Sequence, residues 1–151
     1  KVNRLHVAVA LMQKGYISTA KEAFNSLLSK SGGHYVAPER PTADQIIDFI
    51  RSIGAVSVLA HPFLNLNEDE LVEFLSTAKG LDGMECFYST YDEETTRKAL
   101  EIAERFSLLP SGGSDFHGEA KPGTELGVGK GNLRIPHEWY LALKARVKNR
   151  I

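Results

Sequence analysis

The spacing of hydrophobic positions changes near residue 42 and divides the sequence into two parts. Before that point the pattern is only helical: one apolar face runs through 5–12 and another through 20–28, each followed by glycine. After it, helical faces alternate with short apolar runs such as 55–60, which is rich in β-branched residues. We therefore expect a helical segment over 1–41 and an α/β segment over 42–151.

Local start signals define the helices of the second part. Thr42 with Gln45, and Asn67 with Glu70, have the spacing of capping boxes, and Asp92 is a predicted N-cap. The helices that follow carry apolar faces over 46–53, 71–78 and 99–106, and a final helix begins after Pro136. Strands are predicted between them, at 55–60, where we expect burial on both faces, and at 83–87 and 107–110.

Three strands separated by helices predict right-handed parallel crossovers, and hence an α/β sheet or barrel. In such folds ligands collect at the carboxyl edge of the sheet. His61 follows the first strand, Glu85 lies near the end of the second, and Asp115 and His117 lie in the loop after the third. Three successive strands therefore direct ionisable side chains to one edge.

Histidine and aspartate at such an edge suit a divalent metal, because imidazole nitrogen and carboxylate oxygen are its usual ligands. In an extended loop, Asp115 and His117 would project to the same side and reach one ion or two neighbouring ions. The alternative is structural: His61 would donate to a backbone carbonyl at the strand end, and Asp115 would cap a turn in a glycine-rich loop.

The composition bears on which partners and which compartment we expect for the chain. A chain of 151 residues, 42% hydrophobic, can bury one core. Its net charge of -1 gives no reason to expect duplex nucleic acid or an anionic membrane as a partner, and no apolar run approaches the roughly 20 residues of a spanning helix. Cys86 has no second cysteine to pair with, so we expect a buried thiol and a cytoplasmic location.

Several motifs, in order and covering most of the chain, resemble the later part of the PHP (polymerase and histidinol phosphatase) domain. They are Leu59-Ala60-His61-Pro62, Gly83-Met84-Glu85 and Gly113-Ser114-Asp115-Phe116-His117-Gly118. The opening Asn3-Arg4-Leu5-His6-Val7-Ala8 is similar to a G-R-x-H-I-A segment of the nucleoside 3',5'-bisphosphate phosphatase subgroup, with asparagine in place of the usual glycine.

The resemblance implies a distorted β/α barrel with two or three divalent ions, of Mn, Zn or Fe, in the intact protein. His61, Asp115 and His117 would be metal ligands, and Asp115 and His117 would also be catalytic. Substrate contacts would come from Arg4, whose planar guanidinium suits phosphate, and from His6. Two further residues would orient ligands or loops, namely Glu85 and Ser114.

The resemblance also places an H-x-H motif and further ligands in an N-terminal half that is absent from this sequence. We therefore expect a C-terminal portion that needs this missing half as a partner, with 1–41 as a helical insertion or lid over the site. The implied function is metal-dependent hydrolysis of a small phosphomonoester, such as a nucleoside bisphosphate or a 5'-phosphorylated oligonucleotide. The alternatives are a histidinol-phosphate phosphatase and a non-catalytic metal-binding module.

Overall fold

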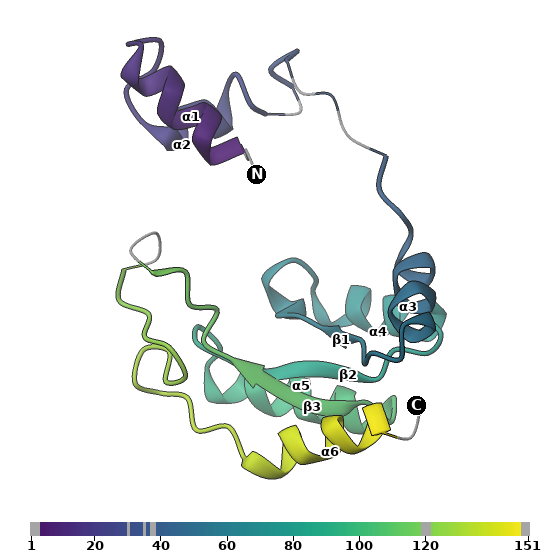
Figure 1. The fold of residues 1–151 in the computed structure, drawn as a ribbon. Coiled ribbons are helices and arrows are strands. Elements are labelled where there is room, and N and C mark those ends of the chain that lie inside the picture. The colour runs from purple at the N-terminus through teal and green to yellow at the C-terminus, as the bar shows by residue number, and fades with distance from the viewer. Residues whose placement is uncertain (1–3, 30, 35, 37–38, 119–121, 149–151) are drawn as a thin grey trace. The chain divides into compact units, whose positions relative to one another are not determined.

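The structure is a computed structural model that describes residues 4–29, 31–34, 36, 39–118 and 122–148. The chain forms two compact units, Lys1–Arg40 and Pro41–Ile151 (Figure 1). None of the described helices is long and apolar enough to cross a membrane.

The first unit is a pair of helices, α1 (Arg4–Gln13) and α2 (Ala20–Asn25). They pack through Ala8 and Ala23, both fully buried. The prediction that the second helix extends to residue 28 is wrong, because Ser26 leaves helical geometry with φ -118 and ψ -96. Whether this unit is an inserted lid stays a prediction.

The second unit is built on a parallel sheet of three strands in the order β1-β2-β3. The strands are β1 (Val58–Leu59), β2 (Gly83–Tyr88) and β3 (Leu109–Gly113). The predicted parallel α/β architecture is therefore confirmed, while its closure into a barrel stays a prediction. Asp82 links the residues just before β1 and β2. Its carboxylate accepts from the backbone nitrogen of Ser57 at 2.9 Å and from the Ser57 hydroxyl at 3.0 Å.

Helices α3 (Ala43–Ser52), α4 (Glu68–Thr77) and α5 (Glu93–Arg105) begin where their caps predicted. Both capping boxes form, at Thr42 and at Asn67. Asp92 accepts from the backbone nitrogen of Thr95 at 2.8 Å. These three local predictions are confirmed, because an N-cap depends on residues only a few positions apart.

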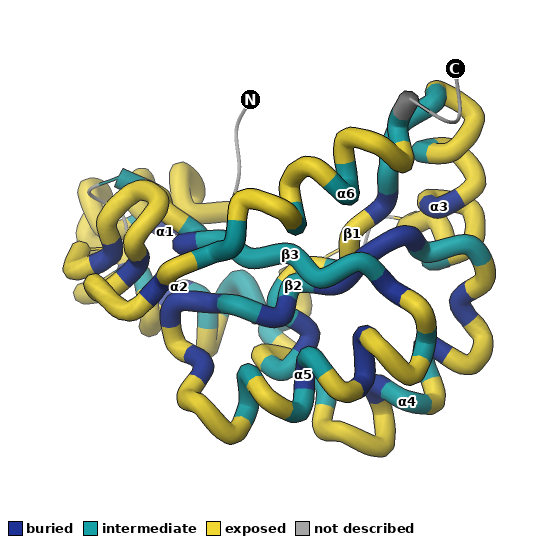
Figure 2. Tube along the Cα trace, turned by 90° about the horizontal axis from the view of Figure 1, so that it is seen from below, coloured by how far each residue is buried: buried dark blue, intermediate teal, exposed yellow. Residues whose placement is uncertain are grey.

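The sheet is covered on both faces. Figure 2 shows α4 and α5 on one side and α6 (His137–Lys148) on the other. Leu71 of α4 and Ala99 of α5 pack against Met84 and Cys86 of β2, and all four are fully buried. On the opposite face Trp139 of α6 lies against Phe87, with ring centroids 4.9 Å apart.

Two predicted strands differ from the observed ones. The strand expected at 55–60 with both faces buried is only β1, and Val58 is 37% exposed, because β1 is the edge strand of this sheet. The strand expected at 107–110 begins later and extends through Gly113. Ser107 cannot belong to it, since its φ of 55 is left-handed where the chain leaves α5.

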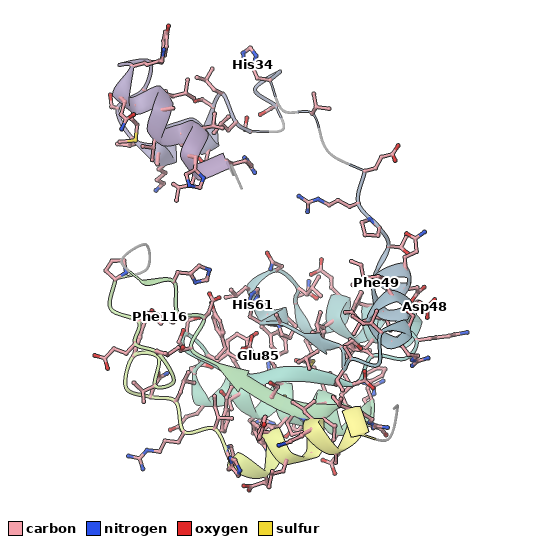
Figure 3. All side chains as sticks on the ribbon, in the orientation of Figure 1. His34, Asp48, Phe49, His61, Glu85 and Phe116 are labelled. Carbon is pink, nitrogen blue, oxygen red and sulfur yellow. The ribbon has the colours of Figure 1, made fainter. Side chains whose placement is uncertain are left out.

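The apolar face predicted for α3 is also only partly correct. Ile47 is buried, but Ile46 and Ile53 are 44% and 64% exposed, and neighbouring Phe49 (Figure 3) is 65% exposed. Periodicity predicted the helix, but it could not predict which part of the apolar face packs against the sheet.

Candidate functional site

Because the three strands are parallel neighbours, the residues that follow them meet at one edge. His61 comes just after β1, Glu85 lies within β2, and Asp115 comes just after β3. The backbone nitrogen of His61 donates to Oε2 of Glu85 at 2.7 Å, so β1 and β2 are linked at this edge. Figure 3 shows the two residues at the same end of the sheet.

Left-handed backbone marks two of the predicted ligands. In the described ranges, non-glycine residues with positive φ are His61 (31), Ser107 (55) and Asp115 (52). Ser107 only ends a helix, but the other two follow strands at the predicted site. Each such conformation costs on the order of 1 kcal/mol, so the surrounding contacts must hold it.

Asp115 and His117 come together, although not for the predicted reason. The expected extended loop is wrong, because the φ of Asp115 lies in the left-handed region. Nδ1 of His117 is nevertheless 2.8 Å from the backbone oxygen of Asp115 and 3.6 Å from its Oδ1. A carbonyl oxygen only accepts, so in a neutral ring Nδ1 carries the proton and Nε2 keeps a lone pair available to a metal.

Tyr88 contacts both His61 and Asp115. Its phenol donates to Oδ2 of Asp115 at 2.8 Å, and its ring centroid lies 5.3 Å from that of His61. Nδ1 of His61 is buried and has no hydrogen-bond partner within the part of the chain that the structure describes. The structural alternative, donation from His61 to a carbonyl, is therefore not seen for this nitrogen. An orphaned buried imidazole nitrogen is a reason to look for a ligand.

Glu85 and Ser114 contact backbone segments next to the predicted ligands. An added Cβ at Gly113 would lie 2.8 Å from Oε1 of Glu85, so the carboxylate occupies the space that the glycine leaves. Ser114 is buried, and its hydroxyl accepts from the backbone nitrogen of Gly127 at 3.3 Å. Both contacts are compatible with the orienting roles expected from sequence, which stay predictions.

Arg4 and His6 belong to the first unit. The guanidinium of Arg4 donates to the backbone oxygen of Leu28 and lies over the ring of Phe24, 5.1 Å from its centroid. His6 is exposed on α1. Arg4 thus has a structural role within its own unit, and substrate contact by either residue stays a prediction.

Sequence reasoning missed the aromatic residues at the site. Tyr88, 2% exposed, packs on Tyr91 with centroids 5.3 Å apart, and Tyr91 meets Phe63 edge-on at 5.9 Å. The Tyr91 hydroxyl accepts from the backbone nitrogen of Phe63 at 2.9 Å. Burial raises the pKa of Tyr91 to about 12, so the phenol is neutral at neutral pH. A tyrosine in an apolar strand looks like core, and only its neighbours in space show otherwise.

A cleft of about 600 Å³ opens beside this aromatic cluster, with Phe63, Tyr91 and Lys98 among its lining residues. Its described lining does not include His61, Asp115 or His117. The cleft therefore adjoins the predicted ligands and does not contain them.

The donors fit a divalent cation in kind but do not complete a site. His61 offers an unpartnered nitrogen, His117 a lone pair on Nε2, and Asp115 a carboxylate. Across the described ranges, however, no three His, Cys, Asp or Glu residues converge closely enough to enclose an ion. A structural divalent site takes four or more ligands, so these three donors alone would not make one.

No family model matches the chain. It is 26% identical over 149 residues to the 3',5'-nucleoside bisphosphate phosphatase of Chromobacterium violaceum, a match that covers 97% of the chain and 52% of that protein. It is 33% identical over 130 residues to the 5'-3' exoribonuclease Rnm of Escherichia coli, covering 83% of the chain and 44% of the relative.

Among solved structures, a protein from Bifidobacterium adolescentis described as a metal-dependent phosphoesterase matches with a TM-score of 0.70 and 30% identity. That match covers 96% of the chain and 50% of the other protein. The relatives that the chain matches, each over about half its length, thus include a nucleoside bisphosphate phosphatase and a PHP-type exoribonuclease. The resemblance found in the motifs is thereby confirmed.

The chain spans about half the length of the curated relatives it matches. These relatives are hydrolases of phosphoesters, and the solved neighbour is described as metal-dependent.

Proposed function

We propose that the chain supplies part of the active site of a metal-dependent phosphoesterase that hydrolyses a small phosphomonoester. A nucleoside bisphosphate or a 5'-phosphorylated oligonucleotide is the expected substrate class, because the relatives include a 3',5'-nucleoside bisphosphate phosphatase and a 5'-3' exoribonuclease. The observation that carries the proposal is the meeting of His61 and Asp115 on Tyr88, with the buried Nδ1 of His61 lacking a partner within the described part of the chain.

His61, Asp115 and His117 would hold the cation, through imidazole nitrogen and carboxylate oxygen. When bound, a divalent ion supplies an activated water and neutralises charge on the phosphate oxygens. Asp115 would also orient the attacking water, because its side chain is 28% exposed and therefore reachable from solvent. Glu85 keeps the backbone of His61 in its left-handed turn through the 2.7 Å hydrogen bond.

The remaining ligands would come from a part of the fold that corresponds to the half of the relatives outside the match. With that part present we expect the sheet to close into a distorted barrel, with two or three ions of Mn, Zn or Fe. We also propose that the first unit covers the site, where Arg4 and His6 would contact the substrate. For its location we propose the reducing cytoplasm.

The test is hydrolysis by the full-length protein that carries this chain, assayed with Mn²⁺. Nucleoside 3',5'-bisphosphate, histidinol phosphate and a chromogenic phosphate ester serve as substrates. We expect the bisphosphate to be hydrolysed, with phosphate release reduced at least roughly 100-fold by Asp115→Asn. Asp48→Asn is the matched control, because Asp48 is exposed on α3 (Figure 3) and should leave turnover unchanged.

The other outcomes decide between the alternatives. Preference for histidinol phosphate would replace the substrate class but keep the reaction. Near-normal turnover by Asp115→Asn would show that Asp115 is neither a metal ligand nor a catalytic residue. Absence of hydrolysis with every substrate, together with tight metal binding, would favour the non-catalytic module.

A further inference from the structure

Tyr88 ends β2 between the two other strand ends that carry predicted ligands. It is 2% exposed, and its ring is held by Tyr91 at 5.3 Å. The hydroxyl of Tyr91 accepts from the backbone nitrogen of Phe63, while its ring makes the contact with Tyr88. The Tyr88 ring therefore belongs to a packed aromatic cluster and has a defined orientation.

The hydroxyl of Tyr88 forms a hydrogen bond with Asp115, which lies in a loop without regular structure. The phenol donates to Oδ2 of Asp115 at 2.8 Å, so the hydrogen bond joins the end of β2 to the segment after β3. A left-handed Asp115 is locally unfavourable, so contacts from outside the loop must stabilise it. A hydrogen bond to a charged carboxylate is stronger than one between neutral groups, so it can offset that local cost.

The ring of Tyr88 packs against His61. The two ring planes are tilted by 56° at a centroid distance of 5.3 Å, so the imidazole rests against the phenol. Nδ1 of His61 has no hydrogen-bond partner in the described ranges, so this nitrogen does not fix the direction of the ring and packing against Tyr88 contributes to it. One buried side chain thus contacts two predicted ligands from different strand ends.

We propose that Tyr88 is a positioning residue that aligns Asp115 and His61 toward a shared divalent cation. The inference rests on the proposed function, since it requires these two residues to be ligands. Hydrogen-bond partners of metal ligands fix ligand orientation, and their loss typically weakens metal affinity by roughly 10–100-fold. Tyr88 touches the ligands and does not itself bind the ion.

The test compares divalent-ion binding by the full-length protein and its variants, using Mn²⁺ competition with a chromogenic chelator. Tyr88→Phe keeps the ring and removes the hydroxyl, and should raise the dissociation constant for Mn²⁺ roughly 10–100-fold. Saturating Mn²⁺ should restore much of its turnover, because the ligand itself remains. Asp115→Asn should not be restored in this way.

Tyr91→Phe is the matched control. It makes the same chemical change in the same aromatic cluster, but its hydroxyl bonds to the backbone of Phe63 and to neither ligand by any contact described above. We expect lower stability toward urea with unchanged Mn²⁺ affinity. An equal loss of affinity in both variants would mean that the cluster merely stiffens the fold, and would overturn the positioning role.

The outcomes separate the two proposals. If the wild-type protein binds no Mn²⁺, both the proposed function and the role of Tyr88 are wrong. If it binds Mn²⁺ and Tyr88→Phe binds equally tightly, the proposed function survives and the positioning role fails. Loss of turnover that saturating Mn²⁺ cannot restore would also overturn it, because Tyr88 would then act on the reaction itself.

Discussion

Substitution of Gly113 by alanine should disturb the candidate site through a single contact. The added Cβ would lie 2.8 Å from Oε1 of Glu85, closer than a carbon and an oxygen normally approach. Gly113 is not in the left-handed region, so alanine fits its backbone and the clash is the main effect. The carboxylate must move, and its 2.7 Å hydrogen bond from the backbone nitrogen of His61 is then lost or lengthened.

The size of the effect follows from that hydrogen bond. A bond to a charged acceptor contributes about 1.5–3 kcal/mol, so we expect Gly113→Ala to lower the free energy of unfolding by about this amount. Glu85→Ala should cost a similar amount, because it leaves the same backbone nitrogen without its acceptor. In the double variant the methyl group has room, so the two losses should not add: the coupling energy should approach 1.5–3 kcal/mol, above the ~0.5 kcal/mol seen for independent sites.

Urea unfolding followed by the fluorescence of Trp139 measures this directly. Trp139 is the one tryptophan of the sequence, and it packs on Phe87 of β2, so its signal reports on the sheet. Gly112→Ala is the control: its Cβ would meet Phe87 and Ile135 and not Glu85, so its loss should add to that of Glu85→Ala. Additive losses for Gly113→Ala and Glu85→Ala would refute the reasoning.

Three further predictions concern the core, the thiol and a helix cap. Leu71→Ala removes a fully buried side chain and should cost about 2–5 kcal/mol in urea unfolding. Burial raises the pKa of Cys86 to about 12, so a chromogenic thiol reagent at about pH 8 should react far more slowly with the folded chain than after unfolding. Hydrogen bonds from Thr95 lower the pKa of Asp92, so its stabilising effect is present above the ordinary carboxyl pKa and lost as the pH falls through the lowered value. Asp92→Ala should therefore reduce the thermal midpoint at about pH 7, and by less as the pH falls through the lowered pKa.

The sequence by itself determined the local features of this protein. Thr42, Asn67 and Asp92 begin their helices as predicted, because a cap needs only a hydroxyl, amide or carboxylate three residues before a backbone nitrogen. The alternation of helices and apolar runs likewise predicted a parallel sheet, since such connections leave few other arrangements. The order of strand ends then predicted that His61, Glu85 and Asp115 share one edge.

Tertiary structure decided what touches what at that edge. Tyr88 looked like one more apolar residue of β2, yet it bonds Asp115 and packs on His61. No local pattern encodes this, because the three residues come from separate strand ends and meet only once the sheet has formed. The same holds for β1 and α3, whose exposed apolar residues Val58 and Ile53 follow the hydrophobic pattern but lack the neighbours that would bury them in the described part of the chain. Periodicity specifies which side of an element can be buried, whereas burial itself depends on elements far away in sequence.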